Sequence, residues 1–139
     1  MKQISAGLYH TCALKNDGTV ICWGLNVHGQ LGNPINNGTD NPNIIPFDVN
    51  ITNVKQISAG GGHTCALKND GTVVCWGIKF AFENVLDPNF RSYRDEPEKM
   101  AITQEENIVQ VTAGLVSTCI LYDTREVYCT GLYDLDSPT

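Results

Sequence analysis

The chain has 139 residues, the size of one ordinary domain, and its composition, 42% hydrophobic and 17% charged, is typical of an ordered protein. A formal net charge of −6, with only nine lysines and arginines, leaves no basic stripe, so we expect no direct contact with nucleic acid. No apolar run approaches the roughly 18 residues that a membrane span needs.

The first and second elements are two nearly identical stretches. KQISAGLYHTCALKNDGTVICWG occupies residues 2–24, and KQISAGGGHTCALKNDGTVVCWG occupies residues 55–77. They differ at three of 23 aligned positions, which are Leu8 against Gly61, Tyr9 against Gly62, and Ile21 against Val74. The chain therefore grew by duplication of one unit, and that unit decides the architecture.

A degenerate third copy occupies residues 109–131. It keeps both cysteines, but Ser117, Arg125 and Thr130 stand where the second copy has its histidine, turn glycine and tryptophan. The copies begin at residues 2, 55 and 109, so the period is just above 50 residues, which is in the range of β-propeller blades.

Each copy is expected to contain a β-hairpin. Asn69-Asp70-Gly71 predicts a three-residue loop with Gly71 in the left-handed conformation. This loop sets a register in which Cys65 opposes Cys75 and Thr64 opposes Trp76. One face then carries Cys65, Leu67, Val73 and Cys75, and the other carries Thr64, Ala66, Val74 and Trp76. Because both faces are mostly apolar, the hairpin is expected to lie between two neighbours, as a blade does.

The small residues before each hairpin are expected near an axis on which the blades converge. They are Ser5-Ala6-Gly7, Ser58-Ala59-Gly60 and Thr112-Ala113-Gly114. Two long loops, 25–54 and 78–108, join the repeat cores 2–24, 55–77 and 109–131 of a single domain, 1–139. Within the loops, the pattern IIPFDV at 44–49 predicts the outer strand of the next blade, and 97–106 predicts a short helix.

The strings ISAGGGHTCALKNDGTVVCWG and WGLNVHGQLG resemble repeats of the regulator of chromosome condensation family, whose full members are seven-bladed propellers. The resemblance implies an all-β fold of four-stranded antiparallel blades, here a partial propeller of about three. Two features depart from the family pattern: Gly29-Gln30-Leu31-Gly32 has no counterpart after Trp76, and the third copy is degenerate.

Three units cannot make seven blades, which would need on the order of 350 residues at this period. An open wedge would expose apolar surface at both ends. The chain is therefore expected to be a fragment, a degraded gene product, or a protomer that completes its ring by self-association.

The six cysteines form three pairs, each ten residues apart: Cys12 and Cys22, Cys65 and Cys75, Cys119 and Cys129. This spacing is too wide for the usual zinc motifs. The hairpin register places each pair directly cross-strand, within disulfide range. Three disulfides would indicate an extracellular or cell-surface location, whereas buried reduced thiols would fit the cytoplasm.

The remaining chemistry-bearing residues favour structural roles. His10 and His63 occupy equivalent positions and are expected to make hydrogen bonds near the axis, Trp23 and Trp76 to pack between blades, and His28 to be solvated. Asp17 and Asp70 belong to turns. No catalytic set, cofactor loop or metal cluster stands out, so the sequence predicts no enzyme and no cofactor.

The favoured function is a non-enzymatic protein-interaction module, since loops on a rigid frame suit recognition. The expected contact residues lie in the unrepeated loop, where aromatic and arginine side chains gather: Phe80, Phe82, Phe90, Arg91 and Tyr93. Two alternatives remain open. One is guanine-nucleotide exchange on a small GTPase, an activity of some family members; the other is a secreted or surface propeller that inhibits an enzyme.

Overall fold

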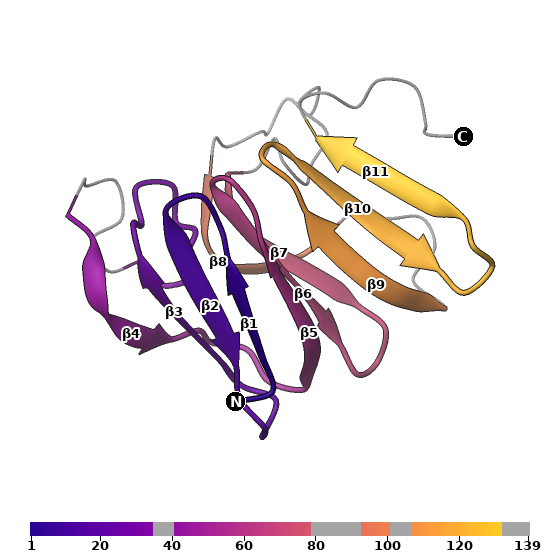
Figure 1. The fold of residues 1–139 in the computed structure, drawn as a ribbon, viewed down its shortest axis with the longest axis horizontal. Coiled ribbons are helices and arrows are strands. Elements are labelled where there is room, and N and C mark those ends of the chain that lie inside the picture. The colour runs from indigo at the N-terminus through magenta and orange to yellow at the C-terminus, as the bar shows by residue number, and fades with distance from the viewer. Residues whose placement is uncertain (35–40, 79–92, 101–106, 132–139) are drawn as a thin grey trace.

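The computed structural model describes residues 1–34, 41–78, 93–100 and 107–131, and these form three antiparallel sheets placed side by side in chain order (Figure 1). The first sheet contains β1 (Gln3–Ala6), β2 (His10–Leu14), β3 (Val20–Gly24) and β4 (Asn43–Asp48). The second contains β5 (Val54–Ala59), β6 (His63–Lys68), β7 (Val73–Ile78) and β8 (Tyr93–Lys99). The third contains β9 (Ile108–Ala113), β10 (Ser117–Tyr122) and β11 (Val127–Gly131). The all-β prediction is confirmed, and we call the sheets blades 1, 2 and 3.

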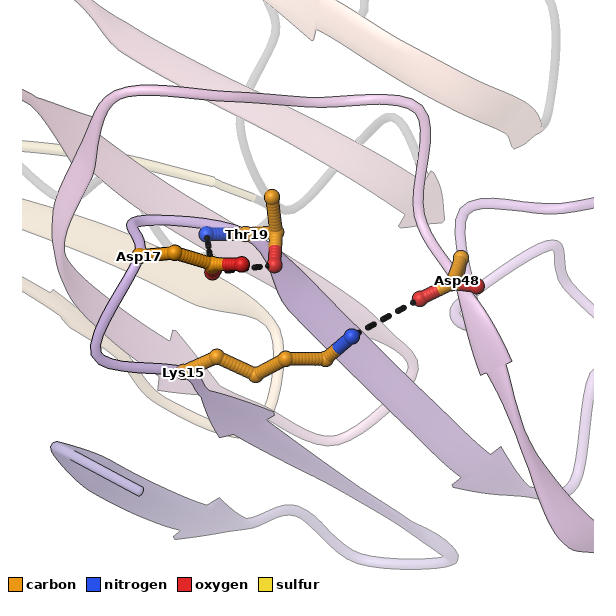
Figure 2. A network of polar contacts seen from close by, with 4 residues as sticks. All are labelled: Lys15, Asp17, Thr19 and Asp48. Atoms are coloured by element: carbon orange, nitrogen blue, oxygen red, sulfur yellow. Dashed lines mark hydrogen bonds and ion pairs between the residues drawn. The ribbon is translucent and has the colours of Figure 1, made fainter.

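The hairpin loops have the predicted geometry. In blade 1, the Asp17 carboxylate accepts hydrogen bonds from the Thr19 amide at 3.0 Å and from its hydroxyl at 2.6 Å (Figure 2). Gly18 has a φ of +84°. The Nζ atom of Lys15, from the same hairpin, lies 3.2 Å from Oδ1 of Asp48 in β4. This exposed ion pair contributes little to stability. Asp17 is therefore a turn former, as the sequence indicated.

Blade 3 keeps this turn after losing its glycine. Arg125 occupies the left-handed position with a φ of 75°, which costs a non-glycine residue of order 1 kcal/mol. Blade 3 thus keeps the left-handed turn conformation although the glycine that favours it has been replaced.

Blade 2 is covered on both faces, as its two apolar surfaces predict. Ala66 and Trp76 pack against Cys12, Leu14, Val20 and Cys22 of blade 1. Cys65, Leu67, Val73 and Cys75 pack against Val111, Ile120 and Tyr122 of blade 3. The register is the predicted one, with Cys65 opposite Cys75 and Thr64 opposite Trp76.

The outer strands differ from two predictions. The segment at 44–49 was expected in the next blade, but β4 pairs with β3 and completes blade 1. The short helix predicted from Pro97 is wrong for residues 97–99, because β8 pairs with β7 at the outside of blade 2. Pro97 is tolerated there because an outermost strand has one unpaired edge. The rest of that predicted helix, 101–106, lies outside the described residues.

Polar side chains fasten each innermost strand to the next one. The Gln3 amide accepts from the Ile57 N–H at 2.9 Å and donates to the Ile57 carbonyl at 2.7 Å, while Ser5 Oγ accepts from the Ala59 N–H at 2.9 Å. The junction between blades 2 and 3 repeats the pattern: Gln56 accepts from the Val111 N–H at 2.7 Å and Ser58 from the Ala113 N–H at 2.8 Å. We call these glutamine and serine side chains the hooks.

Replacing a hook should loosen one junction. Gln3→Ala removes both hydrogen bonds to Ile57 and leaves partly buried backbone groups unpaired, so we expect a loss of about 1 to 2 kcal/mol in the free energy of unfolding, measured with urea. Gln110→Ala is the matched control: Gln110 is the equivalent residue of blade 3, and it is exposed. Equal losses in both variants would contradict a hook at Gln3.

Candidate functional site

A buried network joins four residues of blades 1 and 2. The backbone carbonyl of Gln30 accepts hydrogen bonds from the Thr64 hydroxyl and from the Trp76 indole N–H, both at 2.9 Å. The Thr64 oxygen lies 2.8 Å from Nε2 of His10. Because the single hydroxyl proton points to Gln30, Thr64 accepts from His10, and the imidazole proton therefore lies on Nε2.

The loop after β3 positions the Gln30 carbonyl. The Asn26 side chain accepts from the Leu31 N–H at 2.9 Å, and the Gln30 side chain accepts from the His28 N–H at 2.8 Å. Leu31 enters the core between blades 1 and 2. The loop that contains the motif Gly29–Gly32 is thus held in a conformation that places the Gln30 carbonyl against blade 2.

Burial governs the chemistry of the two axis histidines. It lowers the pKa of His10 to about 4, against a smaller raising effect of a hydrogen bond with the His63 backbone. The pKa of His63 is lowered to about 4, first by burial and then by the nearby His10. His63 Nε2 lies 2.9 Å from the Thr118 hydroxyl of blade 3. The histidines are neutral structural groups at neutral pH, as their repetition predicted.

The glycines beside the axis are needed for close approach. A Cβ on Gly7 would stand 2.6 Å from Cε1 of the His10 ring and would also overlap the Gly60 carbonyl. Backbone hydrogen bonds link neighbouring blades here. Leu8 N–H donates to the Gly60 carbonyl, and Gly61 N–H donates to the Gly114 carbonyl, both at 3.1 Å. The small residues therefore converge as predicted.

An apolar pocket of about 250 Å³ opens where the inner hairpin turns meet the loop after β3. Leu8, Tyr9 and Leu115 form an exposed rim, and Gly61 and Gly62 leave space between them. The remaining lining includes Leu25, Val27, His28 and Ile78. His28 was expected to be solvated, but it is half-buried in this wall, and burial lowers its pKa.

Sequence reasoning missed this pocket, although a signal was present. Two of the three differences between the near-identical copies, Leu8 against Gly61 and Tyr9 against Gly62, lie in its lining. The third, Ile21 against Val74, does not. Within the 23 aligned positions, divergence between copies 1 and 2 is therefore concentrated at the pocket.

The predicted contact residues are mostly beyond reach of the structure. Phe80, Phe82, Phe90 and Arg91 lie outside the described residues. Tyr93 begins β8, where its backbone pairs with Ile78, one of the pocket residues. These five residues stay predictions.

The cysteine pairs are cross-strand neighbours. The Cα atoms lie 4.1 Å apart in Cys12–Cys22 and Cys119–Cys129 and 4.2 Å apart in Cys65–Cys75, with the sulfur atoms at bonding distance. The first and second pairs are fully buried between blades, whereas Cys119 and Cys129 are half-buried on the outer face of blade 3.

Other chemistries find no support in the part of the chain that the structure describes. It contains no group of three or more His, Cys, Asp or Glu side chains that could hold a metal ion. It also contains no helix of the length and apolar character needed to cross a membrane.

The repeat pattern matches a known family. Models of the regulator of chromosome condensation (RCC1) repeat match residues 1–30 and 17–67. The chain belongs to the RCC1 repeat family. Among curated relatives, it is 31% identical over 134 residues to the human probable E3 ubiquitin-protein ligase HERC6, covering 93% of this chain and 13% of HERC6. It is 29% identical over 126 residues to protein RCC1 of Candida albicans, covering 82% of this chain and 27% of the relative.

Several solved structures share the fold. The structure of human WBSCR16 superposes with a TM-score of 0.78 at 21% identity, covering 93% of this chain and 32% of that one. Prp20p of Saccharomyces cerevisiae gives 0.77 at 21% identity over 99% of this chain and 36% of Prp20p. The ectodomain of the Physcomitrella patens receptor kinase CR4 gives 0.62 at 24% identity, covering 98% and 30%. The chain thus spans about a third of each of these solved chains and is a partial propeller.

The lowered pKa values predict acid sensitivity. Because the folded pKa of His10 and His63 is about 4 and the ordinary value is 6.5, the unfolded chain binds more protons between these limits. Stability should fall as the pH drops from 6.5 toward 4, by up to about 1.4 kcal/mol per pH unit for each histidine. Urea unfolding followed by the fluorescence of the buried Trp76 measures this slope.

The variant His10→Gln/His63→Gln separates this effect from carboxylate titration. The difference in stability between wild type and variant should shrink across the same pH window. A difference that stays constant from pH 6.5 to 4 would show that the histidines do not cause the slope.

Proposed function

We propose that the chain is a non-enzymatic protein-interaction module whose pocket receives one large apolar side chain of a partner protein. The observation that carries the proposal is the position of the differences between copies 1 and 2. Two of the three lie in the pocket wall, and the third, Ile21 against Val74, is a conservative change outside it. Change concentrated in one lining is expected where an array of structural repeats acquires a specific surface.

The shape and chemistry of the pocket fit such a partner. Its volume, about 250 Å³, suits a single aromatic or long aliphatic side chain rather than a whole domain. Its rim of Leu8, Tyr9 and Leu115 exposes apolar area that water solvates poorly. The hooks fasten the innermost strands that lead into the three turns lining the pocket, so the pocket is formed before the partner arrives.

The relatives support protein recognition in general terms. Prp20p of yeast binds Gsp1p and histones, and yeast RCC1 (Prp20) has also been solved bound to Kap60. Those partners belong to those proteins, of which this chain covers about a third. No feature of the described residues favours nucleotide exchange or enzyme inhibition, so the proposal stays with recognition. Phe80, Phe82, Phe90, Arg91 and Tyr93 remain additional proposed contacts.

The double substitution Leu8→Gly/Tyr9→Gly tests the pocket without introducing a foreign sequence, because it converts the first copy to the second at these positions. Peptides selected on the wild-type chain from a displayed random library should share an apolar anchor. We expect their affinity, measured by fluorescence anisotropy, to fall at least about tenfold, since burying such side chains contributes 1.5 kcal/mol or more.

Ile21→Val is the matched control, because it makes the remaining change from copy 1 to copy 2 away from the pocket. It should leave peptide affinity unchanged, and both variants should keep the unfolding cooperativity of the wild type. Selection of no peptides, or equal affinity for wild type and double variant, would reject the pocket as the contact site.

The cysteine geometry adds a proposal on compartment: all three pairs are oxidised, and the chain functions in an extracellular or cell-surface setting. Alkylation of the unfolded chain without reductant should then modify none of its six cysteines. Partial reduction should open Cys119–Cys129 first, because that pair is half-buried while the others are covered by neighbouring blades. Each bridge closes a short loop and should contribute about 2 to 3 kcal/mol to stability. Six alkylated thiols before reduction would place the chain among reduced proteins.

A further inference from the structure

The outer surfaces of blades 1 and 3 carry the two halves of a junction that the chain already uses twice. At each internal junction, a glutamine and a hydroxyl side chain of one innermost strand meet backbone N–H groups of the next. A backbone N–H beside the axis also donates to a glycine carbonyl of the next blade.

Blade 3 presents the half whose hook side chains accept. Gln110 and Thr112 occupy the hook positions of β9, and both are exposed. The blade face that packs on the next blade is also uncovered. Val127 is 47% exposed, whereas its equivalents Val20 and Val73 are 0% and 1% exposed under the blade that follows each.

Blade 1 presents the half whose backbone N–H groups donate. The Gly7 N–H bonds to the His10 carbonyl, so the alternation of an antiparallel pair turns the N–H groups of Ile4 and Ala6 away from β2, toward the free edge. These groups are equivalent to the hooked N–H groups of Ile57 and Ala59. Ile4 is 67% exposed, while its equivalents Ile57 and Val111 are 1% and 2% exposed.

The side-chain sizes at the two surfaces are also compatible. The hook and edge residues at the two free surfaces differ from those at the internal junctions only by conservative replacements. Thr112 stands where the internal hooks have serine, and Ile4 stands where blade 3 has Val111. Ser117 replaces the axis histidine and cannot reach as far. The contact between these surfaces should therefore be weaker than an internal junction.

We propose that blade 1 of a second copy of this chain docks on blade 3 of the first, repeating the internal junction in trans. The argument is continuity with an established interface: position by position, the free hooks, the free backbone edge and the exposed apolar residues correspond to groups that are paired or buried inside the chain. The contact is heterologous, because different surfaces of the two copies meet. Each docked copy presents a new blade 3, so association can continue beyond a dimer.

Sedimentation velocity of the 139-residue chain over a range of concentrations tests this self-association. The average mass of the wild type should rise with concentration. Ile4→Lys and Val127→Lys each place a charge that is exposed in the free chain but buried in the proposed contact. Each variant alone should weaken association at least tenfold, while its unfolding midpoint stays that of the wild type.

Mixing the two variants gives the decisive result. Ile4→Lys keeps an intact blade 3 surface and Val127→Lys keeps an intact blade 1 surface, so the mixture should form a one-to-one heterodimer that does not extend. Ile45→Lys, the same change at an exposed isoleucine of the outermost strand β4, should associate as the wild type does.

Three results would overturn the proposal: a wild type that stays monomeric throughout, a mixture that stays monomeric, or association that either end variant leaves intact. The peptide-binding test is independent, because the pocket lining does not include Ile4 or Val127.

Discussion

The structure depends on one constraint: each hairpin is apolar on both of its faces. A strand alternates its side chains between faces, so a hairpin with cysteines, leucine and valine on one side and tryptophan, alanine and valine on the other has no side suited to water. Blade 2 satisfies the constraint because blades 1 and 3 cover it. The fan-like arrangement of the sheets follows from this requirement more than from any single contact (Figure 1).

Polar groups then decide how the covered faces meet. Apolar burial is not directional and would tolerate sliding of one blade against another. The Gln3 amide at Ile57 and the Thr64 hydroxyl between His10 and Gln30 each have one geometry in which they are satisfied. They fix the register of neighbouring blades and explain why glutamine, histidine and threonine recur at these repeat positions.

The repeat pattern made the inner hairpins predictable from sequence, including the register at Cys65 and Cys75 and the two covered faces of blade 2. The outermost strands were harder. An edge strand pairs on one side only, so its sequence constrains its partner weakly, and β4 was placed in the wrong blade while β8 was taken in part for a helix. The pocket could not be predicted because its lining comes from three turns and one loop whose meeting depends on how the blades pack. The comparison of Leu8 and Tyr9 with Gly61 and Gly62 held the clue, but only the structure shows that these residues surround one space.

The carbonyl of Gln30 lies within the repeat that begins at Lys2, yet both of its donors, Thr64 and Trp76, belong to the following one. The duplicated sequence unit and the unit held together by these hydrogen bonds are therefore offset from each other along the chain. Gain or loss of one whole copy would therefore also add or remove hydrogen bonds of this kind in the neighbouring copy. Loss of the second copy in particular would leave the Gln30 carbonyl without either of these donors.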